Sequence, residues 1–202
     1  MGGAALHDPI DPLLAEIRAC RACAKDLAHT PRPVLRASST ARLCIVGQAP
    51  GTKVHETGIP FNDRSGIVLR DWLGLTPEIF YDERRVAIVP MGFCFPGQDE
   101  KGADKPPRKE CARLWRDKLF ARLPQIELTL LIGQYAQRWH LGARHKGSVR
   151  ETVAHWRDFL PDYFPLPHPS WRNQAWLKTH PWFAEDVIPE LRQRVAATLS
   201  SP

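Results

Sequence analysis

Apolar residues along the chain gather into short runs that are separated by amphipathic and polar segments. Three runs are short enough for buried strands: RLCIVG (42–47), RRVAIVPMG (84–92) and LTLLIG (128–133). A fourth, shorter strand is predicted within YFPLPHPS (163–170). Segments whose apolar residues recur at helical spacing alternate with these runs. This alternation predicts an α/β fold, a three-layer αβα sandwich around a central, four-stranded and mainly parallel sheet.

Capping residues mark the starts of several predicted helices. Asp11 suits the start of a first helix, which we expect over residues 11–24. Ser65 is a suitable N-cap for a helix through GIVLRDWLGL, and Ser148 with Glu151 forms a capping box. The remaining helices are predicted in PRKECARLWRDKLFARL (107–123), QYAQRWHLG (134–142) and FAEDVIPELRQRVAATL (183–199), the last of them kinked at Pro189.

Length and composition are those of an ordinary globular protein. With 202 residues, 43% of them hydrophobic and 25% charged, we expect one domain over residues 1–202. No apolar run approaches the roughly 20 residues that cross a bilayer, and the N-terminal MGGAALHDPIDP lacks the features of a signal peptide. We therefore expect a cytoplasmic protein that acts as a monomer and has no membrane partner.

Charge and cysteine content narrow the possible partners. The net charge of +6 favours an anionic partner, and nucleic acid is one such partner. Five cysteines, an odd number in a chain without an export signal, argue against a disulfide framework. Cys20 and Cys23 form a C-x-x-C pair, whereas Cys94 and Cys111 come much later. Cys44 lies within an apolar run and is interpreted as a core residue.

Three polar loops follow predicted strands: GQAPG after the first, PMGFC after the second and HPSWRN after the fourth. Because ligands of parallel sheets bind beyond the carboxyl ends of the strands, we expect these loops to meet at one edge. The glycines of GQAPG allow a ligand to approach the backbone closely. The polar residues of HPSWRN are good donors to phosphates and base edges, although a plain polar turn is an alternative.

The combination of motifs is more specific than any one of them. GQAPG, TGIPFNDRSG and HPSWRN resemble motif A, its extension and motif B of the uracil-DNA glycosylase superfamily. The spacing of the cysteines resembles the iron–sulfur branches of that superfamily, family 4 and family 5, and FNDRSG resembles family 5 in particular. The resemblance extends from about Cys20 to Asn173 and so covers most of the chain.

This resemblance implies a DNA repair enzyme that initiates base excision repair. Such an enzyme hydrolyses the N-glycosidic bond of uracil, or of other deaminated bases, in single- or double-stranded DNA after flipping the base out of the stack. A non-catalytic or product-retaining protein that binds DNA damage is an alternative. A small-molecule hydrolase on the same fold is a third possibility, which the basic charge and the HPSWRN loop disfavour.

The resemblance also implies roles for individual residues. Phe61 would stack on the flipped base, with a core position under the loop as the alternative. His168 would donate a hydrogen bond to the oxyanion that develops on the base. Asp63 would hold the attacking water and stabilise the cationic sugar, or it would cap the following helix instead. Many relatives carry a carboxylate or Asn in motif A, whereas this chain has Gln48 and Ala49. The positioning of water would then pass to Gln48 by hydrogen bonding, to Asp63, or to the pair His55 and Glu56.

Base recognition departs from the family 4 pattern, in which an Asn precedes the third cysteine. Pro90 occupies about that position here, so we expect base recognition from the backbone around Gly92 and Phe93 or from Asn62. We therefore expect weaker discrimination among deaminated bases. Candidate contacts to DNA lie near the two motifs, with a solvated surface as the alternative: Lys53, Ser170, Trp171, Arg172, Asn173 and Lys178, of which Trp171 is also a candidate wedge.

A metal centre is implied by the same resemblance. Its ligands would be Cys20, Cys23, Cys94 and Cys111. Four thiolates suit either a 4Fe–4S cluster or zinc, and the long gap between the second and third cysteines favours the cluster. We expect this centre to have a structural role.

Overall fold

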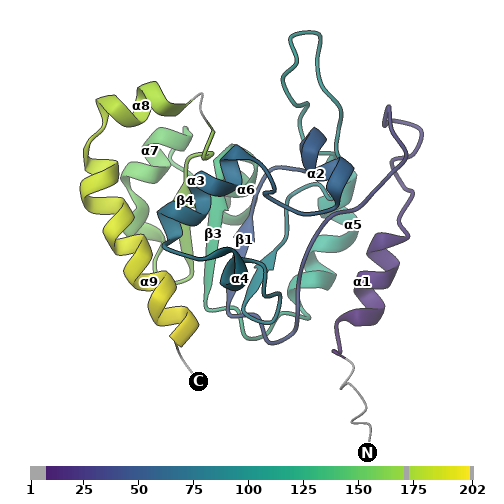
Figure 1. Ribbon diagram of the computed structural model, residues 1–202, viewed down its shortest axis with the longest axis horizontal. Helices are drawn as coiled ribbons and strands as arrows, with labels where there is room; N and C mark the ends of the chain where they lie inside the picture. Colours follow the sequence, from purple (N-terminus) through teal and green to yellow (C-terminus); the bar gives the residue numbers. More distant parts are fainter. Residues whose placement is uncertain (1–7, 171–172, 201–202) are drawn as a thin grey trace, which may run out of the picture.

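The computed structural model describes residues 8–170 and 173–200, which form a four-stranded parallel sheet between two layers of helices (Figure 1). The strand order is β2-β1-β3-β4, and every neighbouring pair runs parallel. The strands comprise β1 (Leu43–Val46), β2 (Val86–Ile88), β3 (Leu128–Ile132) and β4 (Tyr163–Leu166). The predicted three-layer fold class is therefore confirmed, and the sheet is entirely rather than mainly parallel.

Each face of the sheet has its own hydrophobic core. Along β1, Leu43 and Ile45 point into one core and Cys44 and Val46 into the other, because successive side chains of a strand alternate between faces. The core that contains Cys44 is covered by α1 (Asp11–Arg18), α5 (Lys109–Phe120) and α6 (Gly133–Leu141). The opposite core is covered by α3 (Arg64–Leu73), α7 (Val149–Ala154) and α9 (Ile188–Ser200). Burial on both faces explains why the strands are apolar throughout rather than alternating.

Shorter elements lie in the connections. Three helices connect larger elements: α2 (Thr52–Thr57), α4 (Pro77–Phe80) and α8 (Gln174–Thr179). Two 3-10 helices, Gly142–Arg144 and Trp156–Phe159, flank α7, so the helix that follows the predicted capping box changes type after Ala154. The predicted cap of α7 is confirmed, since Ser148 Oγ accepts a hydrogen bond from the backbone N–H of Glu151 at 3.1 Å. None of the helices in the described ranges combines the length and apolar character needed to cross a membrane.

The first helix is shorter than the predicted range of 11–24. It ends at Arg18, and Cys20 and Cys23 lie in the turns that follow. Its last buried residue is Ile17, so a longer helix would have had no further apolar face to pack. The first metal-ligand pair of the prediction therefore belongs to a turn and not to a helix.

Two further helix ends differ from the predictions. Asp63, not Ser65, is the N-cap of α3. Before α9 the chain forms a π-helical turn, Phe183–Val187, where a kink at Pro189 was expected. Proline lacks the N–H that would bond to the carbonyl of Glu185, and its ring crowds that carbonyl, so a wider turn before Pro189 relieves the conflict.

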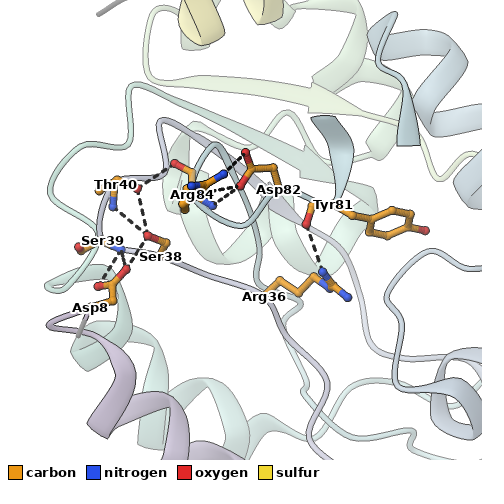
Figure 2. A network of polar contacts seen from close by, with 8 residues as sticks. All are labelled: Asp8, Arg36, Ser38, Ser39, Thr40, Tyr81, Asp82 and Arg84. Carbon is orange, nitrogen blue, oxygen red and sulfur yellow. Dashed lines mark hydrogen bonds and ion pairs between the residues drawn. The ribbon is translucent and has the colours of Figure 1, made fainter. Parts of the chain in front are cut away.

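The segment before β1 covers the outer edge of the sheet. Arg36 pairs with Ile88 of β2 through two backbone hydrogen bonds, in the antiparallel sense. Figure 2 shows the side chains that hold this segment: Ser38 bonds to Asp8, Thr40 to the carbonyl of Arg84, and Arg36 Nη1 to the carbonyl of Tyr81 at 3.1 Å. This segment is therefore anchored to the core, and its Arg36 reaches the loop that contains Tyr81.

Candidate functional site

The loops after β1 and β4 meet at the carboxyl edge of the sheet, as predicted, and they line a cavity of about 650 Å³. A cavity of this size is in the range of sites for small ligands. The predicted site residues that line it are Gln48, Ala49, Phe61, Asp63, His168, Ser170 and Asn173. A smaller adjoining cavity shares Phe61 and His168 and adds Pro90, from the loop after β2, to its wall. We refer to these two spaces together as the edge cavity.

Phe61 is held in an unusual backbone conformation. Its φ of 53° is the one positive value of a non-glycine residue in the described ranges, and a bulky side chain adopts that region at a cost. The carbonyl of Phe61 accepts hydrogen bonds from Tyr81 Oη at 3.2 Å and from Arg70 Nη1 at 3.4 Å. Its ring meets Phe80 edge to face at 6.1 Å between centroids. The ring therefore both packs on the core and forms a wall of the edge cavity, so the two predicted alternatives are not exclusive.

Two glycines make room for Phe61. A Cβ atom on Gly66 would lie 1.7 Å from the carbonyl oxygen of Phe61, and a Cβ atom on Gly47 would lie 3.3 Å from its ring. The first distance is impossible without a shift of the backbone. Gly66 of the FNDRSG motif is therefore required by close packing and not by its own backbone angles.

Asp63 caps α3, which was one of its two predicted roles. Its Oδ1 accepts a hydrogen bond from the backbone N–H of Gly66 at 2.9 Å. The carboxylate also lines the edge cavity. Because an ionised carboxylate has two oxygens and accepts several hydrogen bonds, the cap leaves acceptor capacity for a group inside the cavity.

Gln48 and Asn173 hold loops in place with their side-chain amides. Gln48 Nε2 donates to the carbonyl of Lys105 at 3.3 Å, which links motif A to the loop between β2 and α5. Asn173 Nδ2 donates to the carbonyl of His168 at 2.6 Å, and the N–H of Ser170 donates to the same carbonyl at 2.8 Å. Asn173, predicted to contact DNA, fixes the turn that carries His168.

Several predicted contact residues lie away from the edge cavity. Gly92 and Phe93, expected to read the base, line a different cavity beside the cysteines. Their backbone N–H groups are already used, by the carbonyl of Gln48 at 3.0 Å and by Cys111 Sγ at 3.3 Å. Asn62 is half-buried and is not among the lining residues of the edge cavity.

The structure describes only some of the residues that are predicted to contact DNA. Lys53 on α2 and Lys178 on α8 are exposed, in keeping with either a contact to phosphate or a solvated surface. Trp171 and Arg172 lie outside the described residues.

The four predicted metal ligands line one cavity, which we call the cysteine cavity. Cys20 and Cys23 come from the turns after α1, Cys94 from the loop after β2 and Cys111 from α5. Within the described residues, none of the four takes part in a disulfide. Burial raises the pKa of Cys94 to about 11 and that of Cys111 to about 12. Within the described ranges, no three side chains of His, Cys, Asp or Glu already lie in a position to hold one metal ion.

Cys44 lies apart from the cysteine cavity. It is fully buried in β1, and burial raises its pKa to about 12, so it is a core residue as predicted.

Arg116 is a buried cation that the sequence analysis missed. Only 2% of the residue is exposed, and its guanidinium donates to the carbonyl of Pro90 at 2.8 Å and lies 3.1 Å from His140 Nε2. Burial lowers the pKa of Arg116 to about 10. Burial and this neighbouring charge lower the pKa of His140 to about 3, so the imidazole is neutral and accepts from Arg116. The spacing of Ala112, Arg116 and Leu119 on the buried face of α5 was the available signal.

Tyr81, Arg70 and Asp104 are further residues that the sequence analysis missed. The first two hold the Phe61 carbonyl, and Asp104 lines the edge cavity from the loop before α5. Nothing in the local pattern around these residues distinguishes them from ordinary surface or core positions.

A comparison with known families agrees with this geometry. The sequence model described as the Uracil DNA glycosylase superfamily matches residues 36–192. That range includes the whole sheet and the loops that line the edge cavity, and it begins after Cys20 and Cys23. Because the match covers well over half of the chain, this protein belongs to the uracil DNA glycosylase superfamily.

Proposed function

We propose that this protein is a DNA glycosylase that hydrolyses the N-glycosidic bond of uracil in DNA and thereby initiates base excision repair. The observation that supports this most is the meeting of Phe61, Asp63 and His168 in one cavity, on the loops of a superfamily whose members act on DNA. The motif spacing and the cysteine cavity support a place in the family 4 and family 5 branch.

The residues of the edge cavity suit the steps of base release. A base flipped out of the duplex would enter the cavity and stack on the ring of Phe61. As the glycosidic bond breaks, its electron pair moves onto the base, where His168 would donate a hydrogen bond to the developing oxyanion. The sugar becomes cationic at the same time, and the carboxylate of Asp63 would stabilise it.

The range of bases should be broad. Pro90 offers no side-chain donor, and the backbone N–H groups of Gly92 and Phe93 are already bonded within the protein. Few groups are then left to distinguish uracil from other deaminated bases. We therefore propose activity on hypoxanthine and xanthine in DNA as well, which excision assays with those bases would test.

A second candidate function is the retention of damaged DNA without catalysis. It is favoured by one observation, the presence of Gln48 at the position where many relatives carry a carboxylate. Gln48 accepts and donates hydrogen bonds, but it does not take a proton from water.

The cysteine cavity fits a metal centre held by Cys20, Cys23, Cys94 and Cys111. Four sulfur donors suit a 4Fe–4S cluster, which we propose, or zinc. When bound, the metal centre supplies positive charge that stabilises buried thiolates and joins three separate segments. Phe93 orients one ligand through its hydrogen bond to Cys111 Sγ, and Arg108, which lines the cavity, pairs with Asp26 at 2.9 Å beside it.

One assay separates the two functions. The protein is incubated with an end-labelled oligonucleotide that contains one uracil, and alkali then cleaves any abasic site. Cleavage supports the glycosylase, whereas a gel shift without cleavage supports the binding protein. If neither occurs, both candidates are wrong.

The variants Asp63→Asn and His168→Ala test the assigned roles. Each should slow base release by roughly 100-fold or more in single-turnover experiments. Asparagine caps helices about as well as aspartate, so Asp63→Asn removes the charge and keeps the cap. Unchanged release in Asp63→Asn would show that Asp63 serves α3 alone.

A further inference from the structure

The loop between β2 and α5 folds back as a hairpin next to motif A. It rises beside α2 above the carboxyl edge of the sheet (Figure 1). Gln98 and Asp104 form an antiparallel bridge, and the N–H of Lys105 donates to the carbonyl of Gly97 at 2.9 Å. At the tip, Asp99 Oδ1 accepts from the backbone N–H groups of residues 101 and 103. These bonds give the hairpin a defined shape.

The hairpin is bonded to motif A at one point and lies close to it at a second. Gln48 Nε2 donates to the carbonyl of Lys105 at 3.3 Å. At Gly51, a Cβ atom would lie 3.3 Å from Asp104 Oδ2, so the absence of a side chain there lets the carboxylate approach. The φ of Gly51 is −85°, which any residue adopts, so this glycine serves the close approach and not a turn.

Asp104 faces the same space as the predicted catalytic residues. It lines the edge cavity together with Gln48, Asp63 and His168. Its Oδ1 accepts a hydrogen bond from Gln98 Nε2 at 3.2 Å, which orients the carboxylate. A second carboxylate therefore stands beside motif A, although motif A itself contains none.

We infer that Asp104 is the carboxylate that activates the attacking water, and this inference rests on the proposed glycosylase function. The oxygen of the water forms a bond to the anomeric carbon as the bond to the base breaks. The electron pair of the broken bond leaves with the base, and a proton of the water passes to Asp104. Asp63, tied by one oxygen to the start of α3, is left to stabilise the cationic sugar.

The different roles of Asp63 and Asp104 follow from the surroundings of their carboxylates. The backbone N–H of Gly66 donates to the carboxylate of Asp63, and the positive end of the α3 dipole favours its negative charge, which suits a stabilising role. Asp104 is bonded at Oδ1 to a neutral amide and stands on an exposed hairpin, where bound DNA would cover it. Gln48, placed between the hairpin and the cavity, completes the site of the water by hydrogen bonding.

The test compares base release by the wild type, Asp104→Asn, Asp104→Glu and Glu100→Gln under single-turnover conditions on a uracil-containing duplex. Glu100→Gln is the matched control, because it removes a charge from the tip of the same hairpin outside the edge cavity. We expect Asp104→Asn to slow release by about 100-fold. Asp104→Glu should recover part of that loss, and Glu100→Gln should match the wild type.

Measurement of DNA binding separates a catalytic role of Asp104 from a structural one. Asp104→Asn should bind an uncleavable abasic analogue in DNA at least as tightly as the wild type, since it removes a negative charge near phosphates.

Three outcomes overturn the inference. Release by Asp104→Asn within threefold of the wild type would exclude the role of Asp104 and leave the proposed glycosylase function standing. An equal loss of release and of DNA binding would make the hairpin a binding element only. A wild type that releases no base would overturn the proposed function and this inference together.

Discussion

At the scale of the residue, Phe61 combines strain with a position in the candidate site. Its backbone lies in the left-handed region, where a β-carbon is disfavoured, and two donors on its carbonyl keep it there. Strain of this kind persists only where the surrounding structure over-determines it, and it is common at ligand sites. Tyr81 and Arg70 are therefore supports of the edge cavity although they do not line it.

Phe61 can be tested by two substitutions that differ only in a methyl group. Phe61→Ala and Phe61→Gly should both weaken base release, because base–aromatic stacking is worth about 1–3 kcal/mol. Phe61→Gly should be the more stable of the two by about 1 kcal/mol, since glycine adopts positive φ freely. Urea unfolding would measure the difference, and equal midpoints would contradict the assignment of strain.

At the scale of the element, α3 is positioned by its first turn. Asp63 caps the helix and Gly66 lies against the Phe61 carbonyl, so the start of α3 and the wall of the edge cavity are one structure. The cysteine cavity has a similar construction, because it joins the turns after α1 to a loop and to α5.

Gly66→Ala should disrupt the start of α3. The new methyl group would meet a backbone oxygen at 1.7 Å, so the loop must move, at a cost of about 3 kcal/mol or more. Ile67→Ala is the matched control, because Ile67 is 62% exposed on the same turn and its loss should change stability by less than about 0.5 kcal/mol. Thermal unfolding of both variants, together with base release, checks the prediction. Similar stability of the two variants would contradict it.

The proposed metal ligands can be distinguished experimentally from the core cysteine, Cys44. Cys94→Ser should lose bound iron and the visible absorption of a cluster, because it removes a thiolate at the cysteine cavity. Cys44→Ser should keep its iron although it is destabilised, since Cys44 is buried in β1 away from that cavity. Metal analysis of the purified variants distinguishes the two. Zinc without iron in the wild type would favour the alternative metal, and iron retained by Cys94→Ser would contradict the ligand set.

At the scale of the whole molecule, the parallel sheet brings distant segments to one edge. Each core is built from helices on one face, and the loops at the carboxyl ends of the strands are free to form the edge cavity. Arg116 of α5 donates to the carbonyls of Val89 and Pro90, just after β2. Pro90 lines the edge cavity and Cys94 of the same loop lines the cysteine cavity, so Arg116 supports a loop that both cavities share. The neutral His140 that accepts from Arg116 makes this support sensitive to acid.

Stability should fall with decreasing pH because of His140. Its pKa is lowered from 6.5 to about 3 in the folded state, so below pH 6.5 the unfolded chain binds a proton that the folded chain refuses. Each pH unit in that window should then cost up to about 1.4 kcal/mol, or about 2 kcal/mol between pH 7 and pH 5. His140→Gln, which can still accept from Arg116, should flatten this dependence in urea unfolding. An unchanged slope would exclude His140 as its source.

Much of the fold could be predicted from the sequence because its signals are local. Each of the four strands lies within a predicted apolar run, and Ser148 caps the helix that its position indicated. The prediction failed where packing sets the limits of an element. The first helix stops at Arg18 because Ile17 is its last buried residue, and the turn before Pro189 widens within a packed helix.

The sequence by itself determined the succession of strands and helices along the chain, the family motifs and the loops that form the site. Phe61, Asp63 and His168 lie in the edge cavity because a parallel sheet must bring its strand ends together. Only the tertiary structure decided that Gly92 and Phe93 face the cysteines and that Asp104 stands beside motif A. Those positions depend on the path of the long loop between β2 and α5. Contacts between residues far apart in the sequence set that path, and no local pattern encodes it.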